Sequence, residues 1–290
     1  MKLHTTRIKL SPEQMKADIE NRRGYIGGSD IGTILGLNPY KSPYTLWAEK
    51  VGLVEPEDIS DKDPVWLGHA TEELNGKRFA MKTGKKIIRS NYAYSLLEYP
   101  YLRAHVDFLV RGESAGMEAK FTGFNRCNYE DGQVPDSHFA QCQFYMTVLN
   151  KDAWYLSTIQ SNRYHINRIE RDELFIRFML EKCDEFWAHV TSETPMEVDG
   201  NDDTSKTLER IYPKEDEGVT VQLTGYTSHL DALQELSRQK KEIETLTDSY
   251  KNEIKAFMKD AEIGIADGYK VTWKANSKGS RVFKIKQEEI

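Results

Sequence analysis

The sequence predicts an α/β protein in which a central sheet is flanked by helices, with a helical and hairpin extension at the C-terminus. Residues that alternate between apolar and polar over 103–121 are typical of half-buried strands. Apolar residues recur at helical spacing over 137–149 and 172–190. After Thr194 the chain becomes polar and acidic, which indicates that the compact core ends near this point.

The composition is that of a soluble globular protein, with 290 residues of which 39% are hydrophobic and 30% charged. The net charge of −6 argues against a protein that coats nucleic acid without specificity, although a local basic groove is compatible with it. Cys127, Cys142 and Cys183 form no C-x-x-C pair and predict buried thiols in a reducing compartment. No apolar run approaches the length of a membrane span and no signal core is present, so we expect a cytoplasmic protein.

A helix expected at 13–23 leads into a pair of glycines. Ser29 or Asp30 is the expected N-cap of a short helix after this pair. The free backbone N–H groups of that helix, with Arg22 or Arg23 nearby, form a natural anion site. The alternative is a glycine-rich turn with a routine cap.

A further helix is expected at 65–79 and carries two acidic residues. Glu72 or Glu73 could face the site as an additional ligand of a metal or a water. The alternative is that both are solvated and pair with lysines one turn away. His69 and His105 lack the spacing of metal ligands and are interpreted as structural histidines.

The hairpin over 103–121 carries the strongest functional pattern. Side chains alternate between the faces of a strand, so Glu118 and Lys120 project on one side, and an antiparallel neighbour can bring Asp107 beside them. Two carboxylates can hold Mg²⁺, and a lysine can orient or deprotonate a water for phosphodiester hydrolysis. The alternative is a surface ion pair on an ordinary hairpin.

The helix expected at 137–149 turns Gln141 away from its apolar stripe, so this side chain could point into the site. The polar segment 122–136 predicts a loop beside the site. The remaining expected elements of this region are a helix from Tyr44, strands at 152–159 and 164–170, and a core helix at 172–190 with an apolar stripe of Phe175, Met179, Cys183, Phe186 and Val190.

Two domains are expected, a larger one over 1–200 and an interaction or DNA-contacting module over 201–290. Residues 195–218 are interpreted as a linker because they hold few bulky apolar groups. A long helix at 228–260 follows, with a seven-residue repeat whose seam is only half apolar. A basic hairpin formed by residues 269–274 and 281–286 ends the chain.

Together these motifs resemble the YqaJ-type viral recombinase family, relatives of phage lambda exonuclease in the PD-(D/E)XK nuclease superfamily. The resemblance covers about residues 20–190. One departure is that His105-Val106 stands where the superfamily often has Ser-Pro or Thr-Pro before the aspartate. The matching motifs are Arg22 with Gly27-Gly28-Ser29-Asp30, Gly68-x-x-x-Glu72, Asp107 with Glu118-Ala-Lys120, and Ala140-Gln141-Cys-Gln-Phe-Tyr145.

The resemblance implies a restriction-endonuclease-like core and 5′→3′ digestion of linear double-stranded DNA, which leaves 3′ single-stranded overhangs for phage recombination. It also implies two Mg²⁺ ions per site with Mn²⁺ as a substitute, a ring-shaped homotrimer, a single-strand annealing protein as partner, and a phage or prophage protein in the bacterial cytoplasm. By carry-over, Asp107 and Glu118 bind metal, Glu72 aids the metal or water shell, Lys120 activates the nucleophile, Gln141 orients it, and Arg22 with Ser29 binds the 5′-phosphate.

Rival hypotheses are a related endonuclease, a related nuclease with an iron–sulfur cluster, and a non-cutting DNA-binding or assembly protein. An iron–sulfur cluster held by four cysteines is excluded by a chain with three. The non-cutting alternative is disfavoured because Asp107, Glu118 and Lys120 are all intact.

Overall fold

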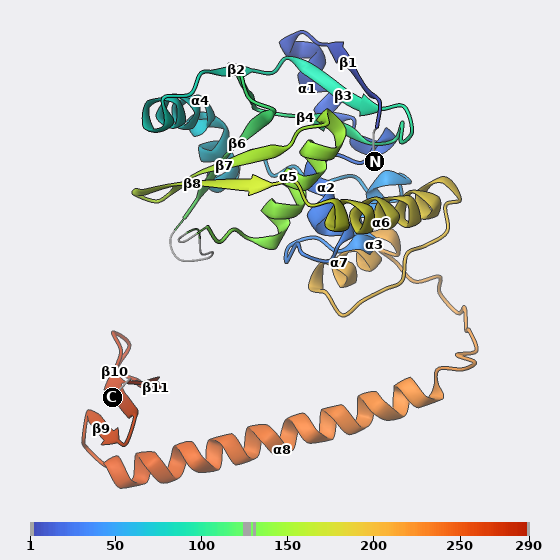
Figure 1. The fold of residues 1–290 in the computed structure, drawn as a ribbon. Coiled ribbons are helices and arrows are strands. Elements are labelled where there is room, and N and C mark those ends of the chain that lie inside the picture. The colour runs from blue at the N-terminus through green and yellow to red at the C-terminus, as the bar shows by residue number, and fades with distance from the viewer. Residues whose placement is uncertain (1–2, 124–128, 130–131, 289–290) are drawn as a thin grey trace. The chain divides into compact units, whose positions relative to one another are not determined.

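The computed structural model describes all of the chain except residues 1–2, 124–128, 130–131 and 289–290 (Figure 1). It divides into two compact units, Met1–Glu215 and Asp216–Ile290. The boundary lies at residue 215 rather than at the expected residue 200. Within the described part of the chain, no helix combines the length and the apolar character that crossing a membrane requires.

A five-stranded mixed sheet forms the centre of the first unit, in the order β2-β5-β6-β7-β8. β6 and β7 are parallel, and every other neighbouring pair is antiparallel. A parallel pair requires a crossover, and the crossover here contains α5 (Asp136–Leu149) (Figure 1). The strands are β2 (Ile87–Arg89), β5 (Phe108–Val110), β6 (Ala115–Thr122), β7 (Ala153–Gln160) and β8 (Arg163–Glu170).

A second, smaller sheet has the order β1-β3-β4 and is antiparallel throughout. Its strands are β1 (Thr5–Lys9), β3 (Tyr92–Leu96) and β4 (Arg103–His105). The first strand of the hairpin expected over 103–121 is therefore two strands, β4 and β5, that belong to different sheets. Asp107 lies in the step between β4 and β5, outside both ladders, so its carboxylate is not confined to the alternation of either strand.

Two hydrophobic clusters cover opposite faces of the central sheet. Trp154 and Leu156 of β7 belong to the larger cluster, whereas the alternate residues Ala153 and Tyr155 belong to the smaller one. The smaller cluster packs against α4 (Asp63–Thr83) through Phe79. A glycine at position 76 allows α4 this approach, because a Cβ there would lie 2.8 Å from Cζ of Phe108.

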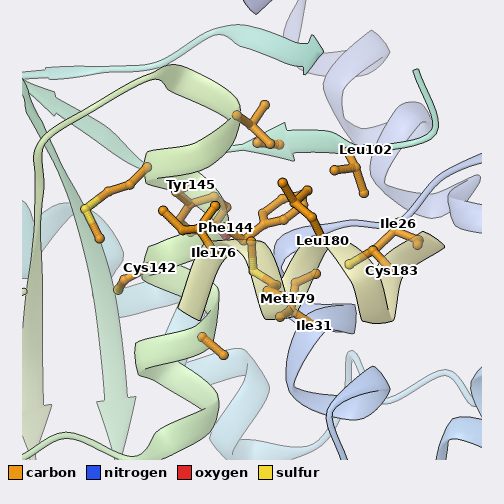
Figure 2. Close-up of a cluster of buried hydrophobic side chains, with 14 of the residues drawn as sticks. Ile26, Ile31, Leu102, Cys142, Phe144, Tyr145, Ile176, Met179, Leu180 and Cys183 are labelled. Atoms are coloured by element: carbon orange, nitrogen blue, oxygen red, sulfur yellow. The ribbon is translucent and has the colours of Figure 1, made fainter. Parts of the chain in front are cut away.

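The larger cluster joins α5 to α6 (Glu173–Thr191) and to segments near the N-terminus, including Ile31 (Figure 2). Asp172 caps α6 as expected, since its carboxylate accepts hydrogen bonds from the backbone N–H groups of Leu174 and Phe175. Burial of each large apolar side chain contributes about 1.5–3 kcal/mol. The buried stripe of α6 is Ile176, Met179, Leu180, Cys183 and Phe186, and the expected Phe175 and Val190 are only partly buried at its margin.

Cys142 and Cys183 are buried free thiols, as expected. Cys127 lies outside the described residues, and so does much of the expected loop over 122–136. The predictions for Cys127 and for this part of the loop therefore remain predictions.

The N-terminal helices differ from expectation at their boundaries. The first helix, α1 (Pro12–Glu20), ends three residues early, and the 3₁₀ helix η1 (Arg22–Gly24) follows it. α2 (Gly28–Ile34) has Gly27 as its N-cap rather than Ser29 or Asp30. Asp30 instead occupies the third helical position, from which its carboxylate accepts a hydrogen bond of 3.0 Å from Gly27 N.

The segment 195–218 contains a helix, α7 (Asp202–Ile211), so its interpretation as a linker was wrong. Asn201 caps this helix, and it packs on α3 (Pro43–Lys50), where the hydroxyls of Thr45 and Thr207 lie 2.7 Å apart. The fully buried residues of α7 are Thr204 and Thr207, and Leu208 and Ile211 are partly buried against the larger cluster. Two bulky apolar residues in ten gave only a weak signal for this helix in the composition of the segment.

The second unit contains the long helix α8 (Thr227–Met258), which agrees with the expected helix to within two residues. The expected terminal hairpin is formed by β10 (Tyr269–Ala275) and β11 (Arg281–Gln287). A third strand, β9 (Ile263–Ala266), pairs with β10 across the two-residue turn Asp267-Gly268 and was not expected, because four residues with a central glycine form a weak strand pattern.

Candidate active site

A cavity of about 900 Å³ in the first unit brings together every residue that the sequence singled out for the site. It is lined by residues of α1, α2, α4, β4, β6 and α5 and of the step before β5. The predicted residues at its surface are Arg22, Ser29, Glu72, Asp107, Glu118, Lys120 and Gln141.

Glu118 lies at the centre of this arrangement and is only 5% exposed. Its Oε1 lies 2.9 Å from Lys120 Nζ and accepts a hydrogen bond of 3.1 Å from Gln141 Nε2. Among the described residues its buried Oε2 finds no hydrogen-bond partner. Asp107 reaches the same place from the step before β5, where its Oδ2 accepts a hydrogen bond of 2.8 Å from Ala119 N.

The carboxylates crowd one another. Burial, with the negative charges of Glu118 and Glu72, raises the pKa of Asp107 well above its ordinary value. Burial lowers the pKa of Lys120, but the Glu118 carboxylate beside it outweighs this effect, so the pKa of the ammonium is raised overall. The Lys120 ammonium contacts Glu118 and the Arg89 guanidinium contacts Glu72, so the carboxylate of Asp107 has no cation of its own in this group.

This donor set fits a divalent cation. Asp107 and Glu118 offer hard carboxylate oxygens, and Glu118 Oε2 is buried without a partner among the described residues. Within the described ranges, no group of three or more His, Cys, Asp or Glu side chains is close enough to hold a metal on its own. Two carboxylates are nevertheless the usual protein contribution to a Mg²⁺ site whose other ligands are water and substrate phosphate.

The two neighbouring glutamates on α4 have different surroundings. Glu73 is solvent-exposed and pairs with Lys77 at 2.7 Å, as the alternative interpretation of this helix expected. Glu72 turns into the cavity, where its Oε1 lies 2.7 Å from Arg89 Nη2. The helix therefore contributes one carboxylate to the candidate site.

Tyr145 is a site residue to which the sequence analysis gave no role. It is buried, and its hydroxyl accepts a hydrogen bond of 2.7 Å from Gln141 Nε2, so that one amide contacts both Tyr145 and Glu118. The available signal was the i, i+4 spacing of Gln141 and Tyr145 on one helix face. α2 approaches this ring so closely that a Cβ on Gly28 would lie 2.6 Å from Tyr145 Cε1.

At the edge of the cavity, Arg22 Nη1 donates a hydrogen bond of 2.7 Å to Ser29 Oγ, and Arg22 Nε donates one of 2.9 Å to Ile19 O. These bonds orient the guanidinium beside an exposed hydroxyl. Arg23, the alternative, pairs with Glu55 at 2.5 Å and does not line the cavity.

The backbone that carries Arg22 is held by Lys50, a buried lysine of α3 that sequence reasoning missed. Its ammonium donates hydrogen bonds to Arg22 O at 2.6 Å, to Tyr25 O at 2.5 Å and to Asp30 Oδ2 at 2.8 Å. All three protons of the ammonium are thereby satisfied. Only the tertiary packing of α3 brings Lys50 to these acceptors, which lie 20 or more residues away along the chain.

His69 and His105 also line the cavity. Nε2 of His105 lies 2.8 Å from Asp18 Oδ2, so this histidine has a structural partner, in agreement with its interpretation from the sequence.

Comparison with known proteins agrees with this architecture. LHK-Exo, an alkaline exonuclease from Laribacter hongkongensis whose structure was solved in complex with dAMP, is 19% identical with a TM-score of 0.51, covering 61% of this chain and 93% of that chain. At this identity the likeness concerns the fold alone. The first unit is accordingly an α/β domain with a restriction-endonuclease-like fold.

Sequence comparison gives the family. Residues 19–152 match the model of the YqaJ-like viral recombinase domain. The "Uncharacterized protein YqaJ" of Bacillus subtilis (strain 168) is 33% identical over 269 residues, which cover 88% of this chain and 82% of that protein. A shorter match of 48 residues, 50% identical, covers 16% of this chain and 14% of "Protein D345L" of African swine fever virus (strain Badajoz 1971 Vero-adapted). The chain belongs to the YqaJ-like viral recombinase family.

Proposed function

We propose that this protein is a divalent-metal-dependent exonuclease that digests one strand of linear double-stranded DNA from its 5′ end and leaves 3′ single-stranded overhangs. The observation that carries the proposal is the shared cavity, which is lined both by the Arg22 and Ser29 pair and by the group around Glu118. An anion site and a hydrolytic site in one cavity suit a substrate whose terminal phosphate binds beside the bond to be cut.

The direction of digestion follows from the proposed anchor. Arg22 and Ser29 offer a guanidinium and a hydroxyl to a terminal 5′-phosphate, and a charge-assisted bond to phosphate is among the stronger polar contacts. The next phosphodiester of the same strand then reaches Asp107, Glu118 and Lys120. A strand whose 5′-phosphate is bound by Arg22 and Ser29 therefore loses its first nucleotide. Each cut leaves a new 5′-phosphate on the remaining strand, which can bind at the same place.

The reaction joins a water oxygen to phosphorus and breaks the bond from phosphorus to the 3′ oxygen of the first nucleotide. One water proton is lost, and the leaving 3′ oxygen gains a proton. A divalent cation held by Asp107 and Glu118, Mg²⁺ by preference with Mn²⁺ as a substitute, supplies positive charge to the phosphate. Lys120 and Gln141 orient the water, Tyr145 holds the amide of Gln141, and Glu72 completes the polar shell.

The family and the fold relatives of this chain support the setting of the activity. The matching family model describes a viral recombinase domain, and LHK-Exo is named an alkaline exonuclease. We therefore place the activity in phage-type recombination in the bacterial cytoplasm, with a single-strand annealing protein as partner. A homotrimeric ring with two metal ions per site is the form that the family resemblance implies.

The test compares linear duplexes with closed circles of the same sequence in the presence of Mg²⁺ or EDTA. We expect loss of linear DNA only, with a label at the 5′ end released as a mononucleotide before a label at the 3′ end of the same strand. Cleavage of the closed circle would instead support an endonuclease. Binding without cleavage in Mg²⁺ and in Mn²⁺ would support the non-cutting alternative and contradict the proposal.

A further inference from the structure

The terminal sheet concentrates positive charge in an otherwise acidic chain. Residues 269–287 contain five lysines, one arginine and no aspartate or glutamate, whereas the whole chain has a net charge of −6. Such local segregation of charge is a physical signature of a surface that meets a polyanion.

The strand register sorts these residues by face. Lys270 lies opposite Lys286, and Lys284 lies opposite Thr272, so side-chain alternation brings Lys270, Lys284 and Lys286 to one face together with Lys274. We call this group, Lys270, Lys274, Lys284 and Lys286, the lysine face.

The opposite face of the sheet is already occupied within the second unit. Trp273 and Phe283 are paired there, and the ammonium of Lys255 from α8 lies 5.8 Å from the centre of the Phe283 ring. Met258 at the end of α8 is buried, and a Cβ on Gly264 of β9 would contact its sulfur at 3.4 Å. The aromatic side therefore forms the small core of this unit, and the lysine face is directed away from it.

The lysine face does not stabilise the folded sheet. Like charges directly opposite each other on a sheet are destabilising, and Lys270 and Lys286 stand in that relation. Glu288 lies 3.6 Å from Lys270, and Glu262 pairs with Lys274. Within the described part of the chain, Lys284 and Lys286 are exposed and make no ion pair.

We propose that the lysine face binds the phosphate backbone of duplex DNA and gives the second unit a grip on the substrate that is separate from the catalytic cavity. Alternate residues of a strand lie about 6.8 Å apart. Two ammonium groups on one face of a strand can contact phosphates of the DNA backbone without reading bases.

The choice of DNA rests on the proposed function, and the main rival is an acidic protein partner. A protein interface is usually centred on buried aromatic anchors. Trp273 and Phe283 lie on the other side of the sheet, and the apolar residues beside the lysines are Val282 and the isoleucines of the edge strand β9, Ile263 and Ile265. Lysines gathered on one face, two of them without an ion pair among the described residues, favour the phosphate backbone.

The experiment uses the full chain with the double variant Lys284→Gln/Lys286→Gln. The matched control is Lys240→Gln/Lys241→Gln, which removes two exposed adjacent charges from α8 in the same unit. Binding of a labelled 30-base-pair DNA duplex is measured by fluorescence anisotropy in EDTA over a range of salt concentrations. Circular dichroism establishes that both variants keep the wild-type helix content.

We expect the lysine-face variant to raise the Kd on the order of tenfold and to reduce the slope of log K against log salt by about 1.8, since each lost phosphate contact removes about 0.9. The control variant keeps the wild-type slope. Unchanged DNA binding in the lysine-face variant, or an equal loss in both variants, would overturn the inference. Unchanged DNA binding combined with lost binding to an acidic protein would assign the surface to the rival.

The measurement in EDTA separates this inference from the proposed function. A wild-type protein that binds duplex through the lysine face but never degrades it would contradict the nuclease and leave the inference intact. If the wild type degrades linear DNA and the lysine-face variant binds DNA with the same Kd as the wild type, the nuclease proposal is supported and the inference is contradicted.

Discussion

At the scale of single residues, Glu118 shows how few contacts define the candidate site. One of its oxygens contacts Lys120 and Gln141, and the other is buried without a partner among the described residues. A buried carboxylate oxygen without a hydrogen-bond partner costs free energy. A ligand that binds this oxygen would offset that cost.

The first prediction concerns Asp107→Asn. The amide keeps an oxygen that can accept the hydrogen bond from Ala119 N, but it removes one charge from the carboxylate cluster. We expect cleavage to fall at least a hundredfold, while the melting temperature in EDTA stays unchanged or rises by a few degrees as repulsion is relieved.

The control for this variant is Glu73→Gln, which alters the solvated partner of Lys77 and should change neither property, because exposed pairs contribute little. Near-normal cleavage by Asp107→Asn would remove the carboxylate cluster from the mechanism.

The second prediction separates two adjacent arginines. Arg22→Ala removes the guanidinium that contacts Ser29, so we expect the preference for 5′-phosphorylated over 5′-hydroxyl ends to fall by about tenfold, corresponding to about 1.4 kcal/mol. Arg23→Ala removes the partner of Glu55 and should keep the wild-type preference. Digestion rates on the two kinds of duplex give the ratio, and a full preference in Arg22→Ala would refute the phosphate anchor.

At the scale of elements, the site depends on how closely neighbouring elements approach one another. β6 presents Glu118 and Lys120 on one face because strand residues alternate, and α5 crosses that face with Gln141 and Tyr145. α2 then covers Tyr145 at a distance that only a glycine permits. The geometry of the Gln141 amide is therefore a property of the contact between α2 and α5.

The third prediction tests this contact with Gly28→Ala. The added Cβ would lie 2.6 Å from the Tyr145 ring, so either α2 or the ring must shift, and overpacking of this kind costs about 1–3 kcal/mol. We expect a melting temperature lowered by several degrees and a reduced kcat as Gln141 loses its support.

The matched control is Gly24→Ala, because a Cβ there meets nothing within 4 Å. If Gly28→Ala and Gly24→Ala behave alike in thermal unfolding and in turnover, the close packing of α2 on Tyr145 has no role in the site.

At the scale of the whole molecule, the boundary between the two units shows which elements the first unit needs to be complete. α7 belongs to the first unit through the buried hydroxyl contact of Thr45 with Thr207 and a hydrogen bond of 3.0 Å from Ser42 N to Asp203. A separation at residue 200 would remove these contacts, whereas one at residue 215 keeps them.

The fourth prediction compares two shortened chains, 1–215 and 1–201. The longer one keeps α7, so we expect it to unfold cooperatively and to cleave short duplexes in the presence of a metal. We expect it to lose at least one of three other properties, which are binding of long DNA, assembly into oligomers and binding of an annealing protein. The shorter one exposes the α3 surface that α7 covers and should melt several degrees lower. Calorimetry and nuclease assays distinguish the two, and an insoluble or inactive 1–215 would mean that the second unit is part of the catalytic core.

Local pattern was sufficient for much of the fold and for naming residues that line the candidate site. Alternation over β6 places Glu118 and Lys120 on one face whatever the fold around them, and the helical stripe of α6 predicts most of its buried residues. Long, strongly periodic segments such as α8 were predicted almost to the residue, because their periodicity is repeated over many turns.

Only the tertiary structure decided the interactions that depend on distant partners. Lys50 meets Arg22 and Asp30 because α3 packs beside them, and Thr207 of α7 is buried because it contacts Thr45 of the same helix α3. The step at Asp107 between two sheets likewise depends on how β4 and β5 pair with different neighbours. Sequence by itself determined the residues that can carry the chemistry, because periodicity is a local property. Which of them meet was decided by packing, because hydrogen bonds and close contacts form between segments that are far apart along the chain.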